Sequence, residues 1–381
     1  MDKKIKIVFF VGTRPEAIKV APIISEIKKH NDIVDSILCI TGQHREMLRQ
    51  ALDDFDLAPD FDLDVMQPNQ TLTLLCSNLF KSIGCFLDHH KPDWVVSQGD
   101  TSTVLASSLC SFFQSTKFAH VEAGLRSFNK FAPFPEEINR RVASLVADIH
   151  FAPTELAKNN LLSEGIPPDD IIVTGNTVVD ALNWMLAVVR TDPPKLVHTV
   201  ENIMEKKLPI VLITGHRREN FGSNFENICL AIKDLSLMYP NVHFVYPVHM
   251  NPNVKNIVFN MLGSLENVNL TEPLRYKEFV RLMDYADFIL TDSGGVQEEG
   301  PSLGKRVLVM RDVTERQEGV DSGLCHLIGT NKQRIVDEVS YIIRSKNSIK
   351  KSMSIVSPYG DGHASKRIVD ALIDMSIAGR R

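Results

Sequence analysis

The stretch that decides the fold stands at the start of the chain, where IKIVFFV (Ile5–Val11) runs directly into GTRPEAIK (Gly12–Lys19). The first segment is apolar on both faces, which is typical of a strand in a parallel sheet covered by helices on both sides. The second places a glycine and a proline where a helix is expected to begin. A similar arrangement returns where IVLIT (Ile210–Thr214) runs into GHRRE (Gly215–Glu219). The chain is therefore predicted to contain two α/β halves that open in the same way.

Other short apolar runs alternate with helix-like segments through both halves. The predicted strands are Lys6–Val11, Ser36–Thr41, Trp94–Gln98, Lys117–Glu122, His150–Ala152 and Ile171–Thr174, and then Ile210–Thr214, His243–Pro247, Phe288–Thr291 and Arg306–Met310. This alternation predicts an α/β protein with two Rossmann-like, doubly wound domains. Because ligands bind at the carboxyl ends of parallel strands, we expect the two domains to face a central cleft.

The length of the chain, 381 residues, favours two domains of ordinary size. We expect an N-terminal domain at residues 1–176 and a C-terminal domain at 177–358. A helix over Thr177–Val189 and the following loop, RTDPP at 190–194, are expected to connect them. The final segment, 359–381, is expected to form a helix that packs back on the N-terminal domain.

The composition argues against several classes of partner. The formal net charge is −5 at pH 7, so neither nucleic acid nor an anionic membrane is indicated. No apolar run approaches the ~20 residues of a membrane-spanning helix. The apolar start is too short for a secretory signal and lacks a small-residue cleavage site. The six cysteines are scattered without a CxxC pair, which favours reduced thiols in a cytoplasmic protein and no cysteine metal site.

Charged residues follow two strands of the first half. Arg14 and Lys19 lie at or within one turn of the predicted helix start, where free backbone N–H groups favour an anion. The alternative is an ordinary solvated helix start. Asp100, in SQGDTST (Ser97–Thr103), comes at the end of a central strand, which is a ligand position. The alternative there is that Asp100 or Thr101 only caps the next helix.

Two further carboxylates belong to the first half. Glu122 lies at the end of the next predicted strand, and Glu136 follows a proline at a predicted helix start. For Glu136 alone, the favourable interaction of a carboxylate with a helix N-terminus is a sufficient explanation. Several carboxylates in one cleft are unfavourable unless they meet a cation or transfer protons. Asp100, Glu122 and Glu136 are therefore candidate general acids and bases.

The second half places different chemistry at its strand ends. His216 follows the first strand, where a histidine donates to a phosphate or transfers a proton, unless it belongs to a simple capped turn. The strongest local signal is LTDSGGVQEEGP (Leu290–Pro301), a strand that ends in Ser-Gly-Gly and opens a helix. Its glycines let a phosphate approach the N–H groups of the helix N-terminus. Glu299 is placed to accept hydrogen bonds from a ribose diol, and Arg316 adds positive charge. The pattern is neither a Walker loop nor the dinucleotide GxGxxG.

Taken together, these motifs resemble the non-hydrolysing UDP-N-acetylglucosamine 2-epimerases, a family with the two-domain fold of glycosyltransferase-B enzymes and glycogen phosphorylase. The resemblance extends over nearly the whole chain. It rests on Gly12–Lys19, Gly42–His44, Gln98–Thr101, Glu122–Arg126, Pro135–Glu137, Gly175–Thr177, Asp292–Glu299 and Pro358–Gly362.

The resemblance implies reversible conversion of UDP-N-acetylglucosamine (UDP-GlcNAc) to UDP-N-acetylmannosamine, which supplies N-acetylmannosamine for bacterial surface polysaccharide. It implies a homodimer that needs no metal, nicotinamide or other cofactor. By the same resemblance, the catalytic residues are Asp100, Glu122, Glu136 and His216. The substrate-binding residues are Arg14, Lys19, Phe279, Ser293, Gly294, Gly295, Glu299 and Arg316.

Two positions depart from the family pattern. Leu274 stands where many relatives have Gln, so the uridine contact there is expected through the backbone only. Some relatives bind a second UDP-sugar as an activator, and Gln43, His44 and Gln70 match that possible regulatory site. Asn69 stands where those relatives have an Arg, which argues against activation by substrate.

The chemistry expected from the resemblance begins with loss of UDP from carbon 1 of the sugar, which acidifies the proton at carbon 2. A carboxylate takes that proton, and a proton returns to the opposite face before UDP adds back. A retaining glycosyltransferase and a nucleotide-sugar sensor are rival interpretations, but both leave the three carboxylates less well explained. A hydrolysing 2-epimerase is a third rival, and such enzymes tend to lack the continuation seen here at Pro15–Lys19.

Overall fold

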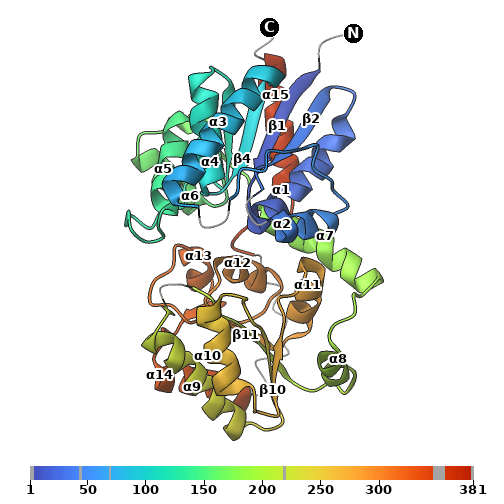
Figure 1. Cartoon of the computed structure of the whole chain (residues 1–381), viewed down its shortest axis with the longest axis vertical. Helices are drawn as coiled ribbons and strands as arrows, with labels where there is room; N and C mark the ends of the chain where they lie inside the picture. Colours follow the sequence, from blue (N-terminus) through green and yellow to red (C-terminus); the bar gives the residue numbers. More distant parts are fainter. Residues whose placement is uncertain (1–3, 43–44, 68–69, 218–219, 346–356, 379–381) are drawn as a thin grey trace. The chain divides into compact units, whose positions relative to one another are not determined.

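The computed structural model describes residues 4–42, 45–67, 70–217, 220–345 and 357–378 (Figure 1). The chain forms two compact units, each built around one parallel sheet. The first unit spans Met1–Trp184 and Tyr359–Arg381, and the second spans Met185–Pro358. The first unit therefore ends inside the helix α7 (Thr177–Thr191) rather than before it. No helix in the described parts of the chain is both long and apolar enough to span a bilayer.

The first unit contains a seven-stranded sheet in the order β3-β2-β1-β4-β5-β6-β7, and all its strand pairs are parallel. Its strands are β1 (Ile5–Val11), β2 (Val34–Ile40), β3 (Phe61–Asp62), β4 (Trp94–Gln98), β5 (Lys117–Val121), β6 (Ile149–Ala152) and β7 (Ile171–Val173). Its helices are α1 (Arg14–Ile27), α2 (Arg45–Asp53), α3 (Leu72–His90), α4 (Ser102–Phe113), α5 (Glu136–Val146), α6 (Glu155–Ser163) and α15 (Ala364–Ala378), with 3-10 turns at Lys28–His30 and Pro168–Asp170.

Strand β1 shows why this sheet forms. Its side chains alternate between the two faces of the sheet, and Val8 and Phe10 pack in one core cluster with Leu79 and Ile83 of α3. Phe9, on the opposite face, is also fully buried. A strand that is apolar on both faces can be accommodated only where helices cover both faces, as they do here (Figure 1).

The second unit repeats the design with six parallel strands in the order β10-β9-β8-β11-β12-β13. Its strands are β8 (Ile210–Thr214), β9 (His243–Pro247), β10 (Val268–Thr271), β11 (Phe288–Thr291), β12 (Val307–Val309) and β13 (Cys325–Leu327). Its helices are α8 (His198–Glu205), α9 (Ser223–Met238), α10 (Pro252–Leu262), α11 (Tyr276–Tyr285), α12 (Gly294–Ser302), α13 (Gln317–Asp321) and α14 (Lys332–Arg344).

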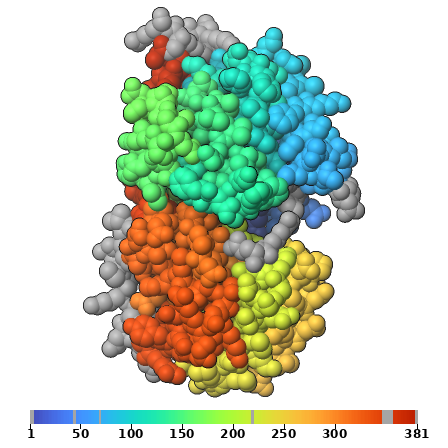
Figure 2. All heavy atoms as spheres, turned by 90° about the vertical axis from the view of Figure 1, so that its left-hand side faces the viewer, coloured from blue at the N-terminus to red at the C-terminus, as the bar shows by residue number. Residues whose placement is uncertain are grey.

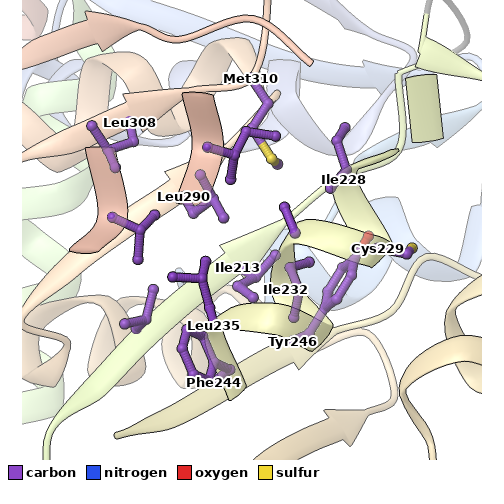
Figure 3. Packing of buried hydrophobic residues seen from close by; sticks show 14 of the residues in the cluster. Ile213, Ile228, Cys229, Ile232, Leu235, Phe244, Tyr246, Leu290, Leu308 and Met310 are labelled. Atoms are coloured by element: carbon purple, nitrogen blue, oxygen red, sulfur yellow. The ribbon is translucent and has the colours of Figure 1, made fainter. Parts of the chain in front are cut away.

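A core cluster of the second unit lies between this sheet and the helices α9, α10 and α14. Ile213, Leu290 and Leu308 come from three neighbouring strands and belong to one buried cluster with Ile232 and Leu235 of α9 (Figure 3). The same strand order around the first strand appears in both units. The prediction of an α/β fold with two Rossmann-like halves is therefore confirmed.

Candidate active site

The loop after β1 is held by a buried carboxylate from its own helix. Glu16 of α1 accepts hydrogen bonds from the backbone N–H groups of Gly12 (2.8 Å) and Thr13 (2.6 Å). It also accepts one from the hydroxyl of Thr101 (2.6 Å), which follows β4. Burial raises the pKa of Glu16 to about 7, although these hydrogen bonds act in the opposite direction. Glu16 therefore ties together two loops at the carboxyl end of the sheet.

Lys19 and Glu122 form a buried ion pair at this end of the sheet. Their side chains are 8% and 7% exposed. The amide of Asn176 also donates to Glu122, at 3.1 Å. The backbone of Glu122 has a φ of +64°, in the left-handed region, which is unfavourable for a residue other than glycine by about 1–3 kcal/mol. This strain is tolerated because the surrounding contacts fix the carboxylate in place.

Asp100 has a partner that the sequence did not reveal. Its carboxylate lies 2.5 Å from the guanidinium of Arg140, a side chain of α5 that is 5% exposed. The neighbouring Asn139 donates its side-chain amide to the backbone oxygen of Asp100 at 2.9 Å. The hydroxyl of Thr101 caps α4 by accepting from the N–H of Val104, so the capping alternative applies to Thr101 and not to Asp100.

The first turn of α5 contains two consecutive carboxylates with different surroundings. Glu137 is fully buried and accepts hydrogen bonds from the backbone N–H groups of Ser127 (3.0 Å) and Phe128 (3.2 Å). Glu136 is the first residue of α5 and is partly exposed. Glu137 therefore holds the preceding loop, whereas Glu136 keeps part of its surface exposed to solvent. Arg14, the first residue of α1, is also partly exposed.

In the second unit, the loop after β8 is held by a carboxylate from a neighbouring strand. Asp292 follows β11, is fully buried, and accepts from the backbone N–H groups of His216 (3.0 Å) and Arg217 (2.9 Å). The imidazole Nδ1 of His216 lies 3.7 Å from Asp292, and its ring stacks on that of His249 at a centroid distance of 5.3 Å. Burial lowers the pKa of His216, while the charge of Asp292 acts to raise it.

The start of α12 brings several candidate residues together. Ser293 is the N-cap residue, and Gly294 and Gly295 begin the helix. A Cβ on Gly294 would lie 2.8 Å from the guanidinium carbon of Arg316, so only glycine allows this close approach. A Cβ on Gly295 would lie 3.9 Å from Oε2 of Glu299. The helix N-terminus, an arginine and a carboxylate thus share one small region.

Arg316 is oriented by two acidic side chains. Its Nε donates to Glu298 at 2.8 Å, and its guanidinium also pairs with Glu315. Burial by itself would raise the pKa of Glu315, but the guanidinium groups of Arg316 and Arg311 hold this pKa well below its usual range. Arg316 therefore has a fixed position beside α12.

Helix α11 contributes two aromatic residues on one face, since Tyr276 and Phe279 are three positions apart. The Tyr276 hydroxyl donates to Oε1 of Glu299 at 2.7 Å, and Tyr276 is buried. Phe279 is partly exposed. The sequence indicated Phe279 only through the family resemblance and did not indicate Tyr276.

Part of the possible regulatory site lies outside the described residues, as Gln43, His44 and Asn69 do. Arg218 and Glu219, from the repeated loop motif, also lie outside them. The side-chain amide of Gln70 donates to the backbone oxygen of Val65 at 3.3 Å. Among the residues that the structure describes, no group of three or more His, Cys, Asp or Glu side chains is arranged to hold a metal ion.

Comparisons with known proteins show the family to which the chain belongs. Residues 25–373 match the family model described as UDP-N-acetylglucosamine 2-epimerase. The chain is 47% identical to a protein of that name from Neisseria meningitidis serogroup A over 375 residues, 97% of this chain and 99% of the relative. It is 46% identical to the protein of that name from Escherichia coli K12 over 369 residues, covering 96% and 98% of the two chains.

A solved structure gives the same result. The crystal structure of UDP-GlcNAc 2-epimerase from Neisseria meningitidis bound to UDP-GlcNAc superimposes with a TM-score of 0.90 at 47% identity, covering 97% of this chain and all of that one. These matches place the chain among α/β enzymes of the isomerase class. The chain belongs to the UDP-N-acetylglucosamine 2-epimerase family.

Proposed function

We propose that the chain interconverts UDP-GlcNAc and UDP-N-acetylmannosamine by eliminating UDP and adding it back. The observation that carries this proposal is the pairing of the strand-end carboxylates Asp100 and Glu122 with the buried cations Arg140 and Lys19. Acid–base groups need a fixed position relative to the proton that they transfer, and these ion pairs supply it. The relative from Neisseria meningitidis was crystallised with UDP-GlcNAc, which supports a ligand of that class here.

In the proposed reaction, the bond between carbon 1 of the sugar and the UDP oxygen breaks, and its electron pair leaves with UDP. Asp100, Glu122 and Glu136 divide between them the removal of the proton at carbon 2 and the return of a proton to the opposite face. A double bond joins carbons 1 and 2 between these steps. Addition of the UDP oxygen to carbon 1 then restores a UDP-sugar with inverted configuration at carbon 2.

The second unit is proposed to hold the nucleotide. The leaving diphosphate gains negative charge, which the N–H groups at Ser293–Gly295 and the Arg316 guanidinium stabilise. His216, after β8, donates to the same group. Glu299 accepts from the ribose hydroxyls, and Phe279 contacts the nucleotide. In the first unit, Arg14 and Lys19 bind substrate. Lys19 also holds the carboxylate of Glu122 in position.

We propose further that the protein acts as a cytoplasmic homodimer, without a metal or an organic cofactor, and supplies N-acetylmannosamine for bacterial surface polysaccharide. Exposed apolar side chains support the dimer. Phe112 and Phe113 on α4 and Leu145 on α5 are 61%, 70% and 75% exposed, and α4 and α5 contact each other. In Figure 2, helices α4 to α6 of the first unit, coloured cyan to green, lie on the surface that faces the viewer. Apolar side chains grouped on a surface favour a protein partner.

Incubation of the protein with UDP-GlcNAc alone in heavy water tests the reaction. We expect a second UDP-sugar with deuterium at carbon 2 and no net loss of UDP. A glycosyltransferase would need an acceptor, a hydrolysing enzyme would release free sugar, and a sensor would leave the substrate unchanged. Mass spectrometry that finds product with its original carbon-2 hydrogen would contradict elimination, because a proton cannot readily cross the ring to the opposite face.

A further inference from the structure

The carboxylate of Glu299 is held by a tyrosine from another helix. Glu299 lies in α12 and is 6% exposed. The hydroxyl of Tyr276, from the first position of α11, donates to its Oε1 at 2.7 Å. Tyr276 is 3% exposed, so its ring is enclosed by the protein. A hydroxyl-to-carboxylate hydrogen bond of this length is charge-assisted and stronger than one between neutral groups.

The two oxygens of Glu299 have different surroundings. Oε1 accepts from Tyr276, whereas Oε2 lies 3.9 Å from the position that a Cβ of Gly295 would occupy. Within the described chain, and leaving aside the neighbours and helix backbone of Gly295, no other heavy atom comes within 4 Å of that position. The carboxylate is thus turned with Oε1 toward Tyr276 of α11 and Oε2 toward Gly295 in the first turn of α12.

We propose that Tyr276 is a positioning residue that sets the preference of this enzyme for a nucleotide with an intact ribose diol. This inference rests on the proposed function, in which Glu299 accepts hydrogen bonds from the ribose hydroxyls of UDP. Tyr276 holds the carboxylate in the orientation that presents Oε2 beside Gly295. A nucleotide that lacks the hydroxyls loses the benefit of this orientation.

The reason for a tyrosine at this place is geometric. A glutamate side chain has three rotatable bonds, and fixing them during binding reduces the affinity gained from the hydrogen bonds. The Tyr276 ring is rigid and buried, so its hydroxyl restricts Glu299 before the nucleotide arrives. Phe279, which is proposed to contact the nucleotide, lies three residues further along α11 on the same helix face.

The same helix provides a matched control. Tyr285, the last residue of α11, donates its hydroxyl to the backbone oxygen of Met204 at 3.1 Å. Tyr276→Phe and Tyr285→Phe each remove one hydroxyl from α11, and with it the hydrogen bond to Glu299 or to Met204. Only the first hydrogen bond involves Glu299.

The experiment measures the affinity of the full chain for UDP and for 2′,3′-dideoxy-UDP by calorimetry. We expect the wild type to prefer UDP by a factor on the order of ten or more, the scale of hydrogen bonds to a charged group. Tyr276→Phe should weaken UDP binding by about 3–10-fold and leave dideoxy-UDP binding unchanged, so that the preference falls by the same factor. Tyr285→Phe should keep both affinities. In the Glu299→Ala background, Tyr276→Phe should have no further effect on UDP binding.

Several outcomes would overturn the inference. If Tyr276→Phe weakened both ligands equally, the hydroxyl would act only through general packing. If it changed neither affinity, Tyr276 would not position Glu299 for binding. If the wild type bound both ligands equally, Glu299 would not read the diol, although epimerisation in heavy water could still succeed. A wild type that binds no UDP would defeat the proposed function and the inference together.

Discussion

The two units of this protein hold the loop after their first strand with different residues. In each, the loop after the first strand must be held at the carboxyl end of the sheet. In the first unit, Glu16 comes from the helix that the loop opens, and it binds the N–H groups of Gly12 and Thr13. In the second unit, Asp292 comes from the end of a neighbouring strand and binds the N–H groups of His216 and Arg217.

The difference extends to the rest of each strand-end region. The first unit relies on buried pairs of charged side chains, as in Lys19 with Glu122 and Arg140 with Asp100. The second relies on glycines at a helix N-terminus with an arginine beside them, as at Gly294 and Arg316. Paired carboxylates suit proton transfer, whereas helix N–H groups suit a phosphate. The two units thus share a topology, and the residues at the strand ends determine the different chemistry of each.

The largest effect that tests this division is expected from the first unit. Asp100→Asn and Glu122→Gln should each lower turnover by about 10² or more, because an amide cannot exchange a proton as a carboxylate does. UDP affinity should stay close to that of the wild type, since the nucleotide is proposed to bind the second unit. Turnover by steady-state kinetics and UDP affinity by calorimetry give the two readings.

A surface ion pair supplies the control for these variants. Asp370→Asn removes an exposed carboxylate paired with Lys366 at 2.6 Å on α15, and it should leave both readings unchanged. Wild-type turnover in either Asp100→Asn or Glu122→Gln would remove that residue from the proposed acid–base set.

The next largest effect is expected from the second unit, and it is on UDP affinity rather than on turnover. Glu299→Ala should weaken UDP binding by about 1–3 kcal/mol, because the ribose loses a charged hydrogen-bond acceptor. Calorimetry measures this directly. Glu266→Ala, which truncates an exposed glutamate before β10, should bind UDP as the wild type does. Unchanged UDP affinity in a folded Glu299→Ala protein would mean that the second unit does not hold the ribose through this residue.

The last expected effect is on the stability of the first unit rather than on turnover or binding, and it concerns Glu16. Burial raises the pKa of Glu16 from 4.5 to about 7, so between these pH values the folded state holds a proton that the unfolded state has released. Stability from this group is then present below pH 4.5 and is lost as the pH rises toward 7. A difference of one in pKa between the folded and unfolded states changes the free energy of unfolding by about 1.4 kcal/mol. For a domain as large as the first unit, this corresponds to a change in Tm of about 3–6 °C.

Glu16→Gln removes the titrating group, so a comparison with the wild type isolates the contribution of Glu16 to stability. We expect the Tm of the wild type, relative to that of Glu16→Gln, to fall as the pH is raised from 5 to 8, with scanning calorimetry as the measurement. A constant difference across that range would show that Glu16 is ionised throughout, held by its hydrogen-bond donors.

The sequence predicted the regular parts of this fold well, for a physical reason. Four strands, Trp94–Gln98, Ile210–Thr214, His243–Pro247 and Phe288–Thr291, have the same bounds in the structure as in the prediction. Each is a short, mostly apolar run, which is typical of a buried strand. The two-residue β3 at the sheet edge was missed, as were β10 and β13, because such short runs form strands only where a neighbour offers them hydrogen bonds.

The candidate site also has a part that the sequence predicted and a part that it did not. Positions after strands are visible in a sequence, so Asp100, Glu122 and His216 were indicated directly. Their partners were not: Arg140 lies 40 residues from Asp100, and Tyr276 lies 23 residues from Glu299. Helical periodicity shows that Arg140 belongs to α5 but not which carboxylate its side chain meets. Such pairs depend on tertiary packing, and no local pattern encodes them.

The last helix of the chain has a consequence for biosynthesis. Residues Ile368 and Leu372 of α15 are fully buried in the first unit, and the indole N–H of Trp94 donates to the hydroxyl of Ser376 at 2.9 Å. Translation proceeds from the N-terminus at about 5–20 residues per second. The second unit, which is continuous in sequence, is therefore complete on the ribosome before the first. Most of the first unit is synthesised before the second, and its surface for α15 stays uncovered until Ala364–Ala378 have been synthesised.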